Sequence, residues 1–150
     1  MRVRHEATKD DYFISTDSSL LNIDLIYNYL STESYWAKNI SKELVIKSII
    51  NSLCFGLYHQ QKQVGFARVI TDKTTFAYLA DVFILEEYRK KGLSKWLIET
   101  IQAYPDLQGF RRWMPGTRDA HGLYEKLGWT VLDEDTRKRF MQRHNKNGYQ

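Results

Sequence analysis

The stretch EEYRKKGLSKWLIE, residues 86–99, decides the fold of this chain. It follows the run LADVFIL, which has the apolar character of a buried β-strand, and it opens an amphipathic helix. Between strand and helix lie Gly92 and the cations Arg89, Lys90, Lys91 and Lys95. Free backbone N–H groups and the helix dipole both favour negative charge at a helix N-terminus. The stretch therefore predicts a loop that binds an anion.

The composition is that of a folded protein rather than a disordered tail. The 150 residues are 43% hydrophobic and 14% aromatic, enough for one domain with its own core, and we expect a single domain over residues 1–150. The net charge of +4 is compatible with polyanionic ligands. The lone cysteine, Cys54, excludes an internal disulfide and fits a reducing compartment. No run of 18 apolar residues and no signal-peptide stretch occurs, so a cytoplasmic protein without membrane association is expected.

Hydrophobic periodicity predicts the element order βααβββαβαββ. Helices are expected after Asp24, after Ser41, after Gly92 and over 120–127, and the second helix should bury the apolar side chains Val45, Ile46, Ile49, Ile50 and Leu53. Strands are expected in DYFIST, LCFGLYH, QVGFARVIT, TFAYLADVFIL and GFRRWMP, with WTVL and RFMQ as a final hairpin. This order predicts an α/β domain of three layers, in which about four helices cover both faces of a mixed sheet of six to seven strands.

Two motifs carry a family resemblance. Arg89, Gly92 and Ser94 form the pattern R-x-x-G-x-S, which resembles the [QR]-x-x-G-x-[GA] pyrophosphate loop of the GNAT acyltransferase superfamily. The stretch AHGLYEKLGW, residues 120–129, resembles the second signature of that family, a helix that carries a tyrosine and ends in Leu-Gly-aromatic. Ser94 departs from the usual Gly or Ala, but serine is still small and its hydroxyl can donate to phosphate. The resemblance covers most of the chain.

This resemblance implies a GNAT-like α/β/α fold and an acetyl-CoA-dependent N-acetyltransferase. Acetyl-CoA is then the expected co-substrate, and a primary amine on a small molecule or peptide is the acceptor, which attacks the thioester directly in a ternary complex. The coenzyme-binding residues implied are Val82, Phe83 and Ile84 for the pantetheine amides, Arg89, Lys90, Lys91, Gly92, Leu93, Ser94 and Lys95 for the phosphates, and Thr117.

The resemblance implies that Tyr124 protonates the departing thiolate. Asp81 interrupts an apolar strand, so it should be ion-paired, be protonated, or face a water-filled cleft. A purely structural pair with Arg68 is one interpretation; the other makes Asp81 a candidate base and acceptor-binding residue. His121, one helical turn before Tyr124, is the competing base. Tyr35 and Trp36, in the loop STESYWAKNI, are candidates for the wall of the acceptor site.

Other functions remain open at the level of sequence. The four histidines lack metal-ligand spacing, so no metal is expected. One alternative is a coenzyme-A-binding protein without transferase activity, which an assay of free-thiol release would distinguish. The other is a nucleic-acid-binding module that uses the basic tail RKRFMQRHNKN; nucleic acid is not the favoured partner, because RFMQR also alternates like an edge strand. A homodimer is compatible with the sequence.

Overall fold

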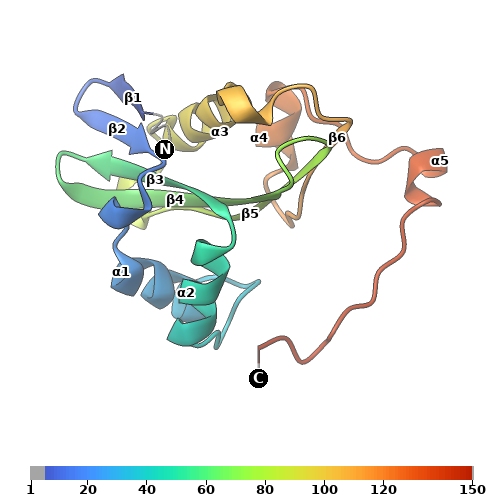
Figure 1. Cartoon of the computed structure of the whole chain (residues 1–150), viewed down its shortest axis with the longest axis horizontal. Helices are drawn as coiled ribbons and strands as arrows, with labels where there is room; N and C mark the ends of the chain where they lie inside the picture. The colour runs from blue at the N-terminus through green and yellow to red at the C-terminus, as the bar shows by residue number, and fades with distance from the viewer. Residues whose placement is uncertain (1–5, 150) are drawn as a thin grey trace.

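The computed structural model describes residues 6–149, so residues 1–5 and 150 of the expected single domain lie outside the described part. One mixed sheet forms the centre of the molecule (Figure 1). Within residues 6–149 it has six strands, in the spatial order β1 (Glu6–Lys9), β2 (Tyr12–Ser15), β3 (Leu53–His59), β4 (Lys62–Thr71), β5 (Phe76–Ile84) and β6 (Arg112–Pro115). Neighbouring strands are antiparallel except for β5 and β6, which are parallel.

Helices cover both faces of this sheet (Figure 1). The five α-helices of residues 6–149 are α1 (Ile23–Asn28), α2 (Lys42–Ile50), α3 (Leu93–Gln102), α4 (His121–Lys126) and α5 (Glu134–Arg137). The layer that contains α1 and α2 closes one apolar core against the sheet, and the layer that contains α3 and α4 closes a second core on the other face. The three-layer α/β/α prediction is confirmed.

The helix α3 shows how the sequence builds the layer behind the predicted anion loop. Gly92 precedes it in the left-handed conformation, with φ of +76°, which a residue without Cβ adopts at little cost. Leu93, Leu97 and Ile101 then recur every fourth residue and are buried against the sheet. Full burial of each such side chain stabilises the fold by about 1.5–3 kcal/mol, so the packing of α3 fixes the end of the loop.

The helix α2 begins as predicted but buries less than predicted. The Oγ of Ser41 accepts a hydrogen bond from the backbone N–H of Leu44, which makes it the helix cap. Val45 and Ile49 are buried, whereas Ile46 is exposed and Ile50 is 70% exposed, contrary to the expectation. Leu53 lies beyond the helix, as the half-buried first residue of β3. A helix on the outside of a sheet contacts it along one stripe, and Ile46 and Ile50 lie on the neighbouring stripe.

The two ends of the sheet also differ from the prediction. The stretch DYFIST forms β2, and β1 precedes it; β1 was missed because it is a short, charged and mostly exposed edge strand. The prediction of a final hairpin is wrong, because neither WTVL nor RFMQ forms a strand. Instead Asp133 caps α5 by accepting from the N–H of Thr136, and the chain continues without regular structure.

The most consequential irregularity is a β-bulge in β5. Phe66 of β4 lies opposite Phe83, whereas Arg68 lies opposite Ala80, so two residues, Asp81 and Val82, face one residue of β4. Asp81 has φ of +54°, an uncommon conformation for a residue with a side chain.

Beyond the bulge, β5 also has a free edge. The pairing of β5 with β6 runs only from Phe76 and Arg112 to Leu79 and Pro115, although β5 continues to Ile84. The bulge and the early end of the pairing together open the sheet between β5 and the chain that follows β6.

Candidate active site

The predicted anion loop presents a row of free backbone donors. The N–H groups of residues 90–95 donate to no acceptor within residues 6–149. Lys90 and Gly92 have φ of +64° and +76°, and left-handed residues in such a turn make successive N–H groups converge into a concave anion-binding nest. A Cβ built on Gly92 would meet no atom within 4 Å, so the space in front of the loop is open. The loop fits a phosphate group.

The side chain of Arg89 is turned back into the protein. Its Nε donates to the carbonyl of Ile84 at 3.0 Å, and its Nη2 donates to the Tyr29 hydroxyl at 2.9 Å. The ring of Tyr29, in the π-helical turn Tyr29–Glu33, stacks on Phe83 with ring centroids 3.9 Å apart. Arg89 thus joins the loop to the end of β5 and to the opposite helical layer. The contact with Tyr29 spans 60 residues and has no signal in the local sequence.

The other predicted phosphate ligands lie around the open side of the loop. Lys90, Lys91 and Lys95 are exposed, Ser94 is half-buried in the first turn of α3, and Leu93 belongs to the core. The lysines can therefore add charge from the solvent side while the backbone supplies directed donors.

The predicted pantetheine strand lies beside the opening in the sheet. The side chains of Phe83 and Ile84 are buried and that of Val82 is half-buried, so packing holds these residues in place. The pairing with β6 ends at Leu79, and the backbone groups of Val82, Phe83 and Ile84 therefore do not pair with β6. Thr117 follows β6, and its Oγ1 accepts from the N–H of Ala120 at 2.9 Å, which organises the turn into α4. An amide-bearing ligand could pair with the free edge as an added strand does.

Tyr124 lies on α4 with its side chain buried and its ring against Trp129, the centroids 5.1 Å apart. Within the described residues its hydroxyl makes no hydrogen bond. Burial, together with the nearby hydroxyls of Tyr35 and Tyr78, raises the pKa of Tyr124 from its ordinary 10 to about 12. The phenol therefore keeps its proton at neutral pH and can donate it.

The carboxylate of Asp81 has two side-chain partners, Arg68 and Trp36. Its Oδ2 accepts from Nε of Arg68 at 2.8 Å, and its Oδ1 accepts from Nε1 of Trp36 at 2.8 Å. The side chains of Asp81 and Arg68 are only 10% and 15% exposed, and Arg68 also donates to the Oγ of Ser52. Of the alternatives for Asp81, the structure shows the ion pair with Arg68, and the contact with Trp36 adds a link to the predicted acceptor loop.

That loop lies over the turn that follows β6. The ring of Tyr35 stacks under the Arg118 guanidinium at 3.9 Å, and the Tyr35 hydroxyl accepts from the backbone N–H of Arg118 at 2.9 Å. Tyr78 contacts the same turn, since a Cβ on Gly116 would lie 2.5 Å from its hydroxyl. Arg118 and Tyr78 were not predicted, because only the folded chain brings these segments together.

His121 lies apart from this cluster of contacts. It is exposed at the first residue of α4, one turn before Tyr124, and it lines the same groove as Thr117, which precedes α4. It makes no hydrogen bond within the described residues, so both ring nitrogens are free.

Comparison with known proteins decides the family. The sequence profile of the Acetyltransferase (GNAT) family matches residues 23–129. An inferred acetyltransferase of Gibberella zeae is 34% identical, over 79% of this chain and 78% of that protein. The chain belongs to the GNAT acetyltransferase family. It is therefore an acyltransferase by family, as the two motifs predicted.

GNAT crystal structures confirm the fold. An inferred GNAT acetyltransferase of Xanthomonas campestris is 48% identical, with a TM-score of 0.87 over 92% of this chain and 96% of that one. A GNAT acetyltransferase of Elizabethkingia anophelis with acetyl-CoA bound has a TM-score of 0.63 at 16% identity, over 93% of this chain and 92% of that one, and it shares the fold.

Three further kinds of feature could give this GNAT chain another role: the cysteine thiol, groups that could hold a metal ion, and helices that could cross a membrane. Cys54 is buried, and burial raises the pKa of its thiol to about 12, so it is a core residue and no nucleophile. Among residues 6–149, no group of three or more His, Cys, Asp or Glu side chains is placed to hold a metal ion. None of the helices in that range is long and apolar enough to cross a membrane.

Proposed function

We propose that this protein is an acetyl-CoA-dependent N-acetyltransferase that moves an acetyl group to a primary amine by direct attack in a ternary complex. The observation that carries the proposal is the row of free N–H groups over residues 90–95, beside an unpaired edge of β5. A ligand with a pyrophosphate at one end and an amide-bearing arm would use both features.

In this proposal the loop and β5 hold the coenzyme. The N–H groups from Lys90 to Lys95 bind the pyrophosphate, with added charge from Lys90, Lys91 and Lys95, and Arg89 keeps the loop ordered. The residues Val82, Phe83 and Ile84 supply backbone groups to the amide-bearing arm, and Thr117 closes the opposite side of the opening. Acetyl-CoA supplies the thioester that is cleaved.

The reacting amine enters between Asp81 and Tyr124. Asp81 attracts the ammonium form and accepts its proton, directly or through water, since only the neutral amine is nucleophilic. A backbone N–H near Phe83 or Ile84 stabilises the oxyanion, and Tyr124 donates its proton to the sulfur that leaves. Tyr35 and Trp36 form the wall of the acceptor site, held by their contacts with Arg118 and Asp81.

An acetyl-CoA-coupled screen of amines tests the activity. Free-thiol release with at least one amine, above hydrolysis without amine, is the expected result. Tight binding of acetyl-CoA with no thiol release across amino acids, polyamines and peptide N-termini would favour the alternative, a coenzyme-A-binding protein without transferase activity.

Replacing Gly92 with valine tests the loop. The variant is expected to bind acetyl-CoA at least about 10-fold more weakly, because a side chain enters the open space and a left-handed conformation costs a residue with Cβ about 1–2 kcal/mol. Calorimetric titration with acetyl-CoA measures the change. Replacing only Lys91 with glutamine should weaken binding less, since the backbone donors remain.

Gly109→Val is the matched control for this experiment. Gly109 has φ of +80° and open space around its Cβ position, but it lies outside the loop, so its replacement carries similar strain without touching the donors. Equal affinity of Gly92→Val and wild type for acetyl-CoA would show that the loop does not hold the phosphates.

A further inference from the structure

Arg118 carries a positive charge that no carboxylate of residues 6–149 pairs with. It is exposed in the turn that joins β6 to α4. Its guanidinium donates no hydrogen bond to any described residue and instead stacks on the ring of Tyr35, 3.9 Å from the ring centroid. The N–H donors of the guanidinium are therefore available to a ligand.

The position of this guanidinium is fixed by the acceptor loop. The backbone N–H of Arg118 donates to the Tyr35 hydroxyl at 2.9 Å, and the ring of Tyr35 lies edge-on to that of Trp36, with the centroids 5.0 Å apart. A guanidinium that already stacks on an aromatic face loses less side-chain freedom when it binds an anion. Arg118 therefore presents its donors in a defined direction.

A continuous series of contacts joins Arg118 to Asp81. Tyr35 contacts both Arg118 and Trp36, and Nε1 of Trp36 donates to Oδ1 of Asp81 at 2.8 Å. Along this series, two aromatic rings separate a cationic group from an anionic one. The Tyr35 hydroxyl also lies near that of Tyr124, the proposed acid. A molecule bound against these rings meets a negative charge at one end and a positive charge at the other.

Arg68 sets the balance of charge on this side of the site. Its Nε lies 2.8 Å from Oδ2 of Asp81, and both side chains are mostly buried, so the two charges largely cancel beyond direct contact. The uncompensated charge of the acceptor wall is then that of Arg118. A diamine would bring a second positive charge towards it, whereas an amine with an acidic group would bring the opposite charge.

We propose that the acceptor is a primary amine that also carries a carboxylate or a phosphate, and that Arg118 binds this anionic group while Asp81 receives the ammonium. The inference rests on the proposed function, since it names the class of amine that the same site accepts. The planar fork of an arginine matches two oxygens of either anion with parallel hydrogen bonds. Arg118 thus determines specificity and takes no part in the proton transfers.

A set of short amines tests the preference. γ-Aminobutyrate and O-phosphoethanolamine carry an anionic group, butylamine carries none, and putrescine carries a second ammonium. With acetyl-CoA, wild type is expected to show a kcat/KM at least about 10-fold higher for an anionic amine than for butylamine, and lower still for putrescine. The higher of the two anionic amines identifies the anion. Equal kcat/KM across the set would overturn the inference and leave the proposed function intact.

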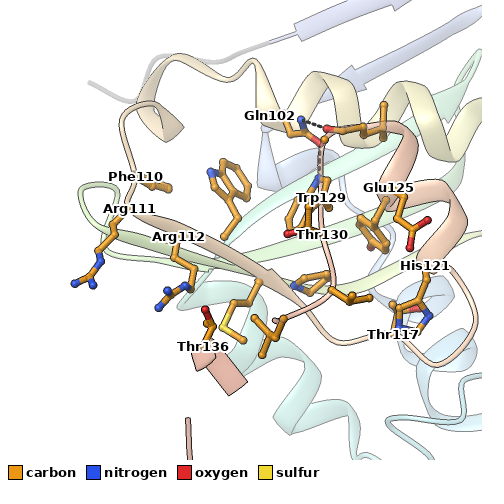
Figure 2. Close-up of a pocket in the computed structure, with 18 of the residues that line it drawn as sticks. Gln102, Phe110, Arg111, Arg112, Thr117, His121, Glu125, Trp129, Thr130 and Thr136 are labelled. Atoms are coloured by element: carbon orange, nitrogen blue, oxygen red, sulfur yellow. Dashed lines mark hydrogen bonds between the residues drawn. The ribbon is translucent and has the colours of Figure 1, made fainter. Parts of the chain in front are cut away.

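Charge reversal assigns the preference to one residue. Arg118→Glu is expected to lose the preference for the anionic amines and to favour putrescine. Arg111→Glu is the matched control, because Arg111 is also exposed but lies at the opposite end of the groove from Thr117 and His121 (Figure 2). It should keep the wild-type order of the amines. An unchanged order in Arg118→Glu, or the same change in both variants, would overturn the inference.

Binding of an acetylated amine measures the same contact without turnover. N-Acetyl-γ-aminobutyrate keeps the carboxylate, whereas N-butylacetamide has no charge. In calorimetric titrations of the protein saturated with coenzyme A, wild type is expected to bind the first at least about 10-fold more tightly, and Arg118→Glu should lose this difference. Equal Kd values in wild type would overturn the inference. If none of the amines releases thiol, the proposed function fails, and these Kd values still decide whether Arg118 binds the anion.

Discussion

Replacing Asp81 with asparagine is expected to lower kcat/KM for the amine at least about 10²-fold, with the affinity for acetyl-CoA nearly unchanged. The bulge places Asp81 directly before the strand residues proposed to hold the coenzyme, and its carboxylate accepts a hydrogen bond from Trp36, a residue of the proposed acceptor wall. Asparagine keeps the shape of the side chain and removes the charge that we propose attracts and deprotonates the amine. Steady-state kinetics at saturating acetyl-CoA measures the effect, and calorimetry measures the affinity for the coenzyme.

A stability measurement separates this role from a structural one. Asp81→Asn leaves the mostly buried Arg68 without its counter-charge, and loss of one partner of such a pair costs about 3 kcal/mol of unfolding free energy. The double variant Arg68→Gln, Asp81→Asn removes both charges and should regain much of that stability. If the double variant also regains activity, Asp81 serves only as the partner of Arg68. His121→Ala should cost less activity than Asp81→Asn, and the opposite ranking would assign the proton to His121.

Replacing Tyr124 with phenylalanine is expected to lower kcat about 10²-fold, the usual scale for loss of a general acid. Phenylalanine keeps the buried ring and its contact with Trp129, so the fold should be retained. The melting temperature of the variant checks this, and single-turnover release of coenzyme A measures the chemical step. An unchanged kcat in a folded variant would make Tyr124 a core residue only.

Tyr58→Phe is the matched control. The hydroxyl of Tyr58 is the one buried side-chain polar atom without a partner in the described part of the chain, and it lies on β3 away from the site. Its removal should leave kcat unchanged and should not destabilise the protein.

The pH dependence of kcat follows from the burial of Tyr124. With a pKa raised to about 12, Tyr124 stays protonated at every lower pH and loses its proton only as pH rises through that value. Ionisation of this tyrosine should therefore cause no fall of kcat in wild type between about pH 7 and pH 10, where an ordinary tyrosine begins to ionise.

Local patterns were sufficient to predict the parts of the site that are contiguous in sequence. The residues from Arg89 to Lys95 form a turn and a helix start whose glycine and charges are neighbours in the chain. Tyr124 lies on a helix whose apolar spacing and final Gly128 can be read directly, and Gly128 has the expected positive φ of +91°. The predicted roles of these residues remain to be tested.

Features that depend on tertiary contact could not be predicted. The bulge at Asp81 depends on the register between β4 and β5, which the alternation of either strand alone does not determine. The stacking of Tyr35 on Arg118 joins residues 83 positions apart. The final hairpin was predicted from the alternation of RFMQ, but a strand also needs a partner edge, and this chain does not fold that segment onto its own β6.

Because Arg89 contacts Tyr29, a shorter fragment of this chain that contains both motifs would lack part of the loop's support. A fragment that begins at β4 would contain both signatures of the family, yet it would lack the hydroxyl that receives the Arg89 guanidinium and the ring that covers Phe83. Arg89 would then be free to rotate, and the turn that it holds would lose its fixed shape before any phosphate arrived. Affinity for the coenzyme is thus a property of the whole α/β/α sandwich, and an engineered minimal acetyl-CoA binder built from this chain must keep residues 23–33.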